Sequence, residues 1–358
     1  MKTPADLQPQ FSPLLLPFSI VYGEAMLLRR HLSQTRLMPR FRAPCACVSV
    51  GNIAWGGAGK TPLIEWLMHW TVEHKVKAAT LSRGYGGQVN RPPVMVGPRH
   101  TAREVGDEPL MLVHSCPQVP VLVDPERRRA ARLAVSRLRP ELLLLDDGFQ
   151  HVDMERDLDL MLLRPEDLGA DWNRVIPAGC WREPESVLEH ADAFLIKCPP
   201  SMMEALMPAA IKRLERFGKP LFSFFLAPLH LRRVDNTETI IDPHLKNKPY
   251  ILITGVARPE QVKDTVTSYV GYAPEEVIVH PDHHRYSYRE VERLNASRKM
   301  VICTAKDAAK LRLFPCPAIW YLRTEVQFGP SLWTDASFPD WWNAWWQTKG
   351  KDMQLPKP

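Results

Sequence analysis

The 358-residue chain lacks long apolar runs, internal repeats and low-complexity tracts. No segment reaches about 18 consecutive apolar residues, so we expect no transmembrane helix. The seven cysteines form no CxxC pair and no metal-ligand spacing, which argues against a disulfide framework and favours a reducing compartment. Neither sign of charge dominates, because 46 basic residues stand against 40 acidic ones, and the net charge of +6 is too modest to indicate nucleic-acid binding.

The composition that remains is that of an ordinary globular protein. Apolar residues make up 45% and charged residues 24% of the chain, which excludes a disordered protein and a coiled coil. Proline is frequent, with 34 residues, and this favours short elements joined by rigid loops. The length is sufficient for two domains, each with its own core.

Short apolar runs alternate with helical patterns along the first 200 residues. The runs lie at 46–53, 77–82, 119–124, 141–147, 158–163 and 192–197. Helix-like segments separate several of them, and nearly continuous apolar strands are typical of a parallel sheet that is covered on both faces. The sequence therefore predicts an α/β fold.

The N-terminal segment combines an apolar helical pattern with a basic flank. Ser12-Pro13 predicts a helix start, with Ser12 as N-cap. Residues 1–50 carry Lys2, Arg29, Arg30, Arg36, Arg40 and Arg42 against two acidic residues, and so hold +4 of the net charge. An apolar helix with a basic flank suits an anionic membrane surface. A core helix followed by a solvated basic turn is the alternative.

A glycine-rich motif follows the first apolar strand and precedes a helical pattern. It consists of Ala54, Trp55, Gly56, Gly57, Ala58, Gly59, Lys60 and Thr61. In a P-loop, glycines turn backbone N–H groups toward phosphates, the lysine reaches the β- and γ-phosphates, and the threonine ligates Mg²⁺. Ala54 departs from the strict pattern, which has glycine there. The sequence predicts a P-loop rather than a glycine-rich turn of no function.

Acidic residues occupy other positions that are typical of a phosphate site. Asp146 and Asp147 end an apolar strand, where a P-loop protein places its metal-binding carboxylate. The alternative is that one caps a turn and the other is solvated. Asp107 opens an apolar helix, either as a helix cap or as a general base. Arg127, Arg128, Arg129 and Arg132 begin another helix, where a solvated basic face is favoured over a phosphate contact.

A change of pattern at 218–235 divides the chain. We predict a P-loop NTPase-type parallel sheet core and a second, smaller α/β domain, joined by a β-ribbon linker. The expected segments are an N-terminal interfacial helix at 1–34, the P-loop core at 35–220, the linker at 221–236, the second domain at 237–325 and a Trp-rich tail at 326–358 that packs on the core.

Several motifs, taken in order along the chain, together resemble one family. They are SVGNIAWGGAGKTPLIEWL, LSRGYGG at 81–87, VGDEPLML at 105–112, LLLLDDGFQH at 142–151, IPAGCWREP at 176–184, TGVARPEQ, PDHHRYS at 281–287 and CTAKDAAKL. The family is tetraacyldisaccharide 4′-kinase, the lipid A kinase of Gram-negative bacteria. The resemblance implies an enzyme that transfers the γ-phosphate of ATP to the 4′-hydroxyl of a tetraacyldisaccharide 1-phosphate.

The resemblance also implies roles for individual residues. The catalytic set is Asp107 as general base, His283 as its partner from the second domain, and Lys60 on the phosphates. The residues from Ala54 to Thr61 would bind ATP, and Thr61, Asp146, Asp147 and Glu183 would surround Mg²⁺. His151, Arg182 and His284 are further site candidates, and the residues alone do not separate His283 from His284.

The implied setting is the cytoplasmic face of the inner membrane of a Gram-negative bacterium, where the protein is peripheral. The partners are the lipid A disaccharide precursor and the anionic membrane surface, and neither nucleic acid nor an obligate protein partner is inferred. Two alternatives are another small-molecule P-loop kinase and a membrane-peripheral P-loop nucleotide switch. The switch, unlike a kinase, requires no acceptor base such as Asp107.

Overall fold

The computed structural model describes residues 4–35, 40–235, 239–241, 245, 248–256 and 258–352. The chain forms two compact units. Unit 1 comprises Met1–Leu81, Glu126–Phe225 and Gln327–Pro358, and unit 2 comprises Ser82–Pro125 and Leu226–Val326. Some of the positions named above lie outside the described residues. They are the expected segment ends at 1, 236, 237 and 358 and the basic residues Lys2 and Arg36.

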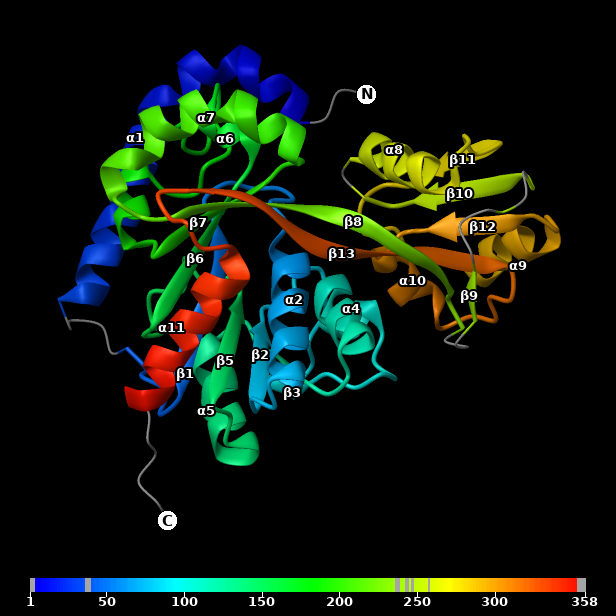
Figure 1. Ribbon diagram of the computed structural model, residues 1–358, viewed down its shortest axis with the longest axis horizontal. Helices are drawn as coiled ribbons and strands as arrows, with labels where there is room; N and C mark the ends of the chain where they lie inside the picture. Colours follow the sequence, from blue (N-terminus) through cyan, green and yellow to red (C-terminus); the bar gives the residue numbers. More distant parts are fainter. Residues whose placement is uncertain are drawn as a thin grey trace. The chain divides into compact units, whose positions relative to one another are not determined.

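Unit 1 is built on a parallel sheet (Figure 1). Its strands are β1 (Ala46–Asn52), β2 (Ala78–Ser82), β5 (Leu142–Asp146), β6 (Leu158–Leu163), β7 (Ala193–Lys197) and β8 (Leu221–Arg233), in the order β8-β7-β6-β1-β5-β2. Every residue of β1, β5 and β6 is buried, as expected for strands that are covered on both faces. The predicted α/β class is confirmed.

The helices of unit 1 follow the predicted alternation. They are α1 (Pro4–Gln34), α2 (Lys60–Glu73), α5 (Arg127–Leu138), α6 (Pro165–Leu168), α7 (Pro200–Leu214) and α11 (Phe338–Asp352), with 3₁₀ turns η1 (Glu185–His190) and η2 (Glu215–Phe217). Helix α11 lies beside α2 (Figure 1), where the rings of Trp342 and Trp70 are 5.3 Å apart and edge to face. Trp70 Nε1 donates to Asn343 Oδ1 at 2.8 Å, which fixes the C-terminal helix on this unit.

Helix α1 covers most of the segment 1–34 that was expected to hold an N-terminal helix. The helix runs through Pro13 and Pro17, so Ser12 lies within it and is not its N-cap. None of the helices in the described part of the chain has both the length and the apolarity that crossing a membrane requires.

Unit 2 contains a second, smaller parallel arrangement. Its strands β10 (Tyr250–Thr254), β11 (Glu276–Val279), β12 (Met300–Cys303) and β13 (Ile319–Leu332) are ordered β11-β10-β12-β13. Short antiparallel pairs join β3 (Val94–Met95) to β4 (Val121–Val123) and β9 (Ile240–Ile241) to β8. The helices are α3 (Ala102–Val105), α4 (Asp107–Ser115), α8 (Pro259–Val270), α9 (Tyr288–Ala296) and α10 (Ala305–Leu311).

The division of the chain differs from the expected one in one respect. Residues 82–125 were expected within the 35–220 core, but they belong to unit 2. The reason is packing, since α4 contacts α10, and Arg323 Nη2 donates to Ser115 Oγ at 3.4 Å. Contacts between residues so far apart in sequence leave no local signal, and the apolar run at 119–124 resembles the strands of unit 1.

Candidate functional site

The glycine-rich loop of unit 1 lies between the end of β1 and the start of α2. Gly59 caps α2 with φ +94°, a conformation that favours glycine. A Cβ atom at Gly59 would also lie 2.8 Å from Cζ of Phe224. Thr61 follows in the first turn of α2 and is nearly buried, and Trp55 is 60% exposed.

A second segment, residues 180–182, lies along this loop. The backbone N–H of Trp55 donates to the carbonyl of Cys180 at 2.9 Å, and that of Arg182 donates to the carbonyl of Ile53 at 2.7 Å. Arg164 adds a bond from Nη1 to the carbonyl of Trp55 at 3.3 Å. These bonds hold the loop on both sides, so its backbone is preorganised rather than free.

Lys60 meets polar groups at the carboxyl edge of the sheet. Its Nζ donates to Oδ1 of Asn52 at 2.9 Å and lies 3.6 Å from Oδ1 of Asp147. Gln150 Nε2 donates to the carbonyl of Asn52 at 3.1 Å. Asn52 is a polar residue at the end of a fully buried strand, a position from which the sequence suggested a supporting rather than a catalytic role.

Asp147 is the carboxylate that faces Lys60. Arg182 donates from Nη1 to both of its oxygens, at 2.9 and 2.8 Å, and to Oε1 of Gln150 at 3.2 Å. Burial by itself would raise the pKa of Asp147, but Lys60 and Arg182 hold that pKa below its ordinary value. Asp147 is therefore ionised at neutral pH, and its carboxylate can bind a cation.

Asp146 ends β5 and is buried, with 2% of its surface exposed. Its carbonyl accepts a bond from Nη2 of Arg127 at 3.0 Å. Arg127 is completely buried, so the expectation of a solvated basic face is wrong for this residue. A guanidinium withdrawn from water must be held by acceptors, and here it supports the turn that carries the two aspartates.

Glu183 has a different partner from the one expected. Nη2 of Arg30, on α1, lies 2.8 Å from Oε2 and 3.1 Å from Oε1, and Nε lies 3.3 Å from Oε1. Both side chains are 5% exposed. Nη2 of Arg30 also donates to the carbonyl of Phe149 at 3.2 Å. Arg30 therefore neutralises Glu183, and it does not contribute to the basic surface that the sequence suggested.

The remaining candidates of unit 1 lie nearby. His151 follows Phe149 and Gln150, and its Nδ1 lies 3.9 Å from Oδ1 of Asp153.

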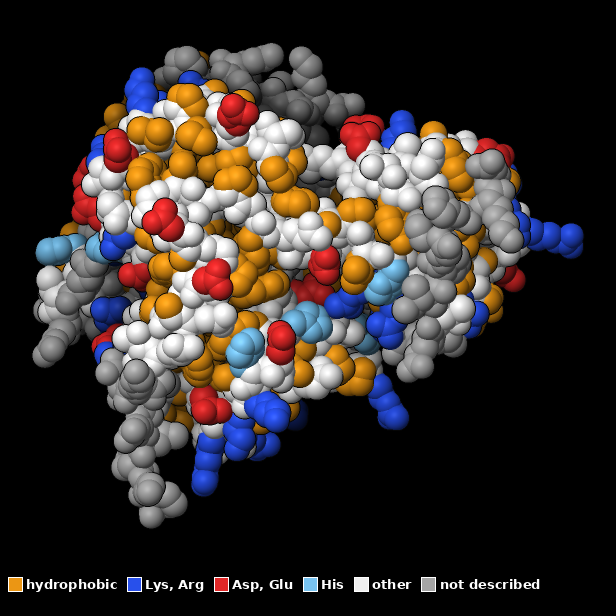
Figure 2. Space-filling model, in the orientation of Figure 1, with side chains coloured by type: hydrophobic (Ala, Val, Ile, Leu, Met, Phe, Trp, Pro, Cys, Tyr) orange, Lys and Arg blue, Asp and Glu red, His pale blue; other side chains and the backbone are white. Residues whose placement is uncertain are grey.

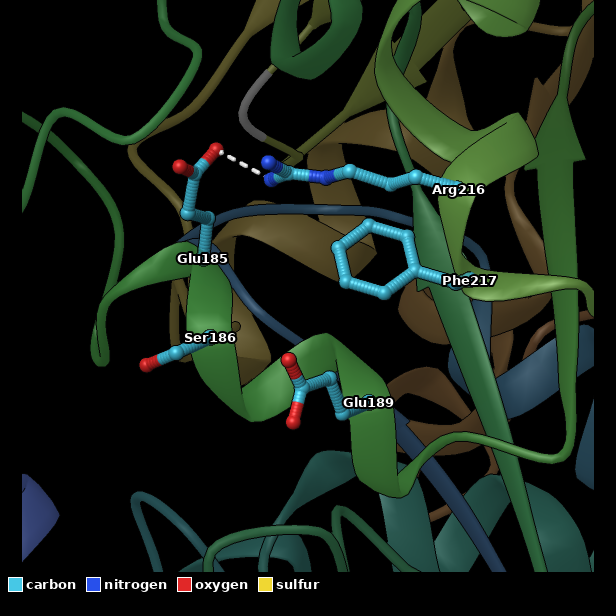
Figure 3. Close-up of a pocket in the computed structure, with 5 residues that line it drawn as sticks. All are labelled: Glu185, Ser186, Glu189, Arg216 and Phe217. Carbon is cyan, nitrogen blue, oxygen red and sulfur yellow. Dashed lines mark ion pairs between the residues drawn. The ribbon is translucent and has the colours of Figure 1, made fainter.

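Figure 3 shows a separate polar cavity of about 340 Å³, lined by Glu185, Ser186, Glu189, Arg216 and Phe217. An ion pair of 2.9 Å joins Arg216 to Glu185 across it. None of the predicted site residues lines this cavity.

Asp107 opens α4 in unit 2 and depends on the glycine before it. Gly106 has φ +91°, and a Cβ atom there would lie 2.7 Å from the carbonyl oxygen of Tyr85. The side chain of Asp107 is 8% exposed. The GYGG and GDEP motifs therefore meet backbone to backbone, and this close approach sets the position of the carboxylate.

The two adjacent histidines have different partners. Nδ1 of His283 lies 3.0 Å from Oδ2 of Asp107, whereas Nε2 of His284 lies 3.1 Å from Oε1 of Glu290. His283 has φ +61° and packs near the ring of Tyr85, at 5.9 Å between centroids. Asp107 and His283 belong to the same compact unit, contrary to the expectation that the histidine comes from a separate domain.

Two lysines near Asp107 were not predicted. Nζ of Lys310 lies 3.7 Å and Nζ of Lys306 lies 4.0 Å from Oδ2 of Asp107. Both belong to the TAKDAAK motif, and their i, i+4 spacing places them on one face of α10. That spacing was the signal available in the sequence.

These features define a class of protein. A glycine-rich loop between a parallel strand and a helix that starts with Lys-Thr is typical of α/β proteins that bind nucleotide phosphates. A buried carboxylate bonded to an imidazole is typical of acid–base catalysis. Together these features indicate an α/β protein that acts on a nucleotide phosphate.

Comparison with known proteins identifies the family. The model of the tetraacyldisaccharide-1-P 4′-kinase family matches residues 11–337. A tetraacyldisaccharide 4′-kinase of Nitratidesulfovibrio vulgaris is 48% identical over 342 residues, covering 96% of each chain, and one of Oleidesulfovibrio alaskensis is 42% identical over 350 residues, covering 95% of this chain and 97% of the relative. The chain belongs to this family and is a phosphotransferase with an alcohol acceptor, as its motifs predict.

A solved structure supports the same assignment. The crystal structure of LpxK from Aquifex aeolicus in complex with ATP is 26% identical, with a TM-score of 0.74, and covers 96% of this chain and 100% of that chain. The predicted fold class is thus shared by a protein of the same family.

Proposed function

We propose that the protein transfers the γ-phosphate of ATP to the 4′-hydroxyl of a tetraacyldisaccharide 1-phosphate, giving lipid IVA. The observation that carries the proposal is the buried carboxylate of Asp107, bonded to His283 at 3.0 Å, in a chain that also holds a lysine at a glycine-rich loop. A nucleotide switch needs no such base. The family match supports the lipid acceptor.

The glycine-rich loop is the proposed ATP site. Residues 54–61 would bind the phosphates through backbone N–H groups and the N-terminus of α2, and Lys60 would neutralise their charge. The LpxK structure from Aquifex aeolicus contains ATP, which supports a nucleotide here. The contact of Lys60 with Asn52 positions its ammonium at the helix start before the nucleotide binds.

Magnesium is the proposed cofactor, and the donor set fits it. Thr61, Asp146 and Asp147 offer the hydroxyl and carboxylate oxygens that Mg²⁺ prefers, and the ion would neutralise charge on the β- and γ-phosphate oxygens. Asp147 is ionised at neutral pH because Lys60 and Arg182 lower its pKa. We do not assign Glu183 to the metal, since Arg30 occupies both of its oxygens.

Asp107 would act on the acceptor. Its carboxylate takes the proton of the 4′-hydroxyl as the hydroxyl oxygen attacks the γ-phosphorus and the bond to ADP breaks. His283 holds the carboxylate through Nδ1 and compensates its charge when protonated. Most of the rate enhancement would come from positioning and charge neutralisation, because the transferred phosphoryl group needs little covalent help.

We further propose that α1 docks unit 1 on the cytoplasmic face of the inner membrane of a Gram-negative bacterium. Six of its large apolar side chains are more than half exposed, namely Leu14, Leu16, Phe18, Ile20, Val21 and Leu28. Tyr22 and Leu27 pack on a core cluster that also includes Met203 and Ala210 of α7. Apolar side chains also gather over α7 in Figure 2, which extends the apolar surface beyond α1.

The kinase proposal is tested with purified protein, ATP, Mg²⁺ and the disaccharide 1-phosphate lipid in detergent micelles. We expect phosphorylation of the lipid, loss of product on addition of EDTA, and recovery with excess Mg²⁺. Asp107→Asn should lower kcat by roughly 10²-fold or more while leaving ATP binding intact, since a general base contributes about 10²–10⁴-fold. Wild-type turnover by Asp107→Asn would contradict the assigned base.

The membrane proposal is tested by flotation with vesicles of phosphatidylglycerol and phosphatidylethanolamine. We expect the wild-type protein to float with the vesicles and the double variant Phe18→Ser/Val21→Ser to remain in solution, because it removes exposed apolar surface from α1. The matched control is Val279→Ser/Leu313→Ser, which changes two comparably exposed side chains of unit 2. Equal flotation of both double variants would exclude α1 as the docking element.

A further inference from the structure

Helix α10 presents two lysines to Asp107, and they differ in how they are held. Nζ of Lys310 lies between two carboxylates, 3.7 Å from Oδ2 of Asp107 and 3.3 Å from Oδ1 of Asp307, and its side chain is 6% exposed. Nζ of Lys306 lies 4.0 Å from Asp107 but 2.7 Å from Oδ1 of Asp282, and its side chain is 19% exposed. Lys310 is therefore the buried neighbour of the proposed base.

Asp307 is a rigid anchor for Lys310. It is completely buried, and its Oδ2 accepts bonds from Thr304 Oγ1 at 2.7 Å and from the backbone N–H of Gly255 at 3.2 Å. Its Oδ1 accepts a bond from the hydroxyl of Tyr286 at 3.0 Å. A carboxylate fixed by donors from three different segments cannot rotate away, so the ammonium that it attracts is fixed as well.

The aromatic ring of Tyr286 adds a second restraint. Nζ of Lys310 lies 5.5 Å from the centroid of that ring, within the range of a cation–π interaction. A buried ammonium is costly unless it is paired, so Lys310 gains by remaining between the two carboxylates. The side chain is thus a fixed charge rather than a flexible surface lysine.

The contacts on Asp107 converge on one oxygen. Oδ2 is the carboxylate oxygen nearest to His283, to Lys306 and to Lys310, and the hydrogen bond with His283 is made at Oδ2. We propose that Lys310, anchored by Asp307, is a positioning residue that holds Oδ2 of Asp107 against His283 and leaves Oδ1 to receive the proton of the acceptor hydroxyl. This inference rests on the proposed kinase function.

The test measures kcat and KM of the full-length protein with ATP and the disaccharide lipid, with kcat normalised to the concentration of ATP-binding sites. Lys310→Met should lower kcat by about tenfold or more, with both KM values within about threefold of wild type, because a misaligned base affects the transition state. Lys310→Arg, which keeps the charge, should retain more of kcat than Lys310→Met. Where Lys310→Met does not fold, Lys310→Gln replaces it.

Two further variants, each of which removes a different lysine of unit 2, serve as controls. Lys299→Met removes a lysine paired with Glu275 at the surface of the same unit and should leave kcat unchanged. Lys306→Met should cost less than Lys310→Met, since Asp282 is its short contact. A kcat for Lys310→Met within about twofold of an active wild-type protein overturns the inference alone. A wild-type protein that does not phosphorylate the lipid overturns the proposed function and this inference with it.

Discussion

Asp107 owes its position to the residue before it, since Gly106 has a positive φ and a Cβ atom there would lie 2.7 Å from the carbonyl oxygen of Tyr85. Gly271 offers a comparison, with φ +90° and no described atom within 4 Å of the position that a Cβ would take. Its ψ is −2°, in the left-handed helical region, whereas ψ at Gly106 is 156°, in a region that essentially only glycine occupies. The comparison therefore measures the strained backbone and the close approach at Gly106 together.

We expect Gly271→Ala to lower the free energy of unfolding by about 1–3 kcal/mol, the usual cost of a non-glycine residue at such a φ. Gly106→Ala should lose about 1–3 kcal/mol more, because its φ and ψ suit only glycine and because the new methyl group overlaps the Tyr85 carbonyl. Urea unfolding of both variants measures the difference. Equal losses would show that neither the backbone conformation nor the overlap at Gly106 carries an additional cost.

At the scale of elements, α1 is anchored to unit 1 through a buried ion pair. Arg30 donates to the carboxylate of Glu183 and to the backbone carbonyl of Phe149. Glu183 follows residues 180–182, which lie along the glycine-rich loop, and Phe149 lies just after Asp146 and Asp147. The guanidinium of Arg30 also stacks over the Phe149 ring, 4.6 Å from its centroid. The helix proposed to dock on the membrane is thus bonded to the backbone beside the proposed phosphate site.

A double-mutant cycle tests this anchor. Arg30→Met leaves Glu183 buried without its counter-charge and should lower the free energy of unfolding by about 3–5 kcal/mol. Arg30→Met/Glu183→Met should recover most of that loss, because two apolar side chains of similar volume need no partner. Urea unfolding of Arg30→Met, Glu183→Met and the double variant at neutral pH gives the three losses. A double variant that loses the sum of the single losses would mean that the two residues act independently.

The elements were largely predictable from the sequence, and their long-range partners were not. The apolar runs at 141–147 and 158–163 identified β5 and β6 because strands buried on both faces need such runs. The loop at Gly59 and Lys60 was identified because phosphate binding restricts the residue types. The pairing of Arg30 with Glu183 spans 153 positions and leaves no periodic trace, so Glu183 was assigned to the metal instead.

At the scale of the whole molecule, several partly buried histidines contribute to the response to acid. Partial burial lowers the pKa of His114, His230 and His280, and for His114 the value falls to about 4, with Arg312 as a further cause. The unfolded chain binds these protons more readily, near the ordinary pKa of about 6.5. Stability is therefore complete above that pH and declines as the pH falls toward 4.

We expect the urea midpoint to fall between pH 7.5 and pH 5, with a smaller fall for His114→Gln, which removes one of the titrating groups. The pairing of Asp147 should not contribute in this window, because a carboxylate with a lowered pKa loses its stabilising effect only below about pH 4. Midpoints that are equal at both pH values in the wild-type protein would contradict the effect of these partly buried histidines.

The path of the chain through the two units has a consequence for synthesis on the ribosome. Unit 1 takes segments from both ends of the chain, and unit 2 takes residues 82–125 and 226–326. Translation delivers residues in order at about 5–20 per second. The buried members of the core cluster of unit 1 around Trp181 all lie within Ile53–Leu221, so this cluster can pack once Leu221 has emerged. The clusters of unit 2 need β13, and α11, with its buried Trp342, arrives last. The apolar strands of unit 2 therefore stay without their full set of partners until late in synthesis.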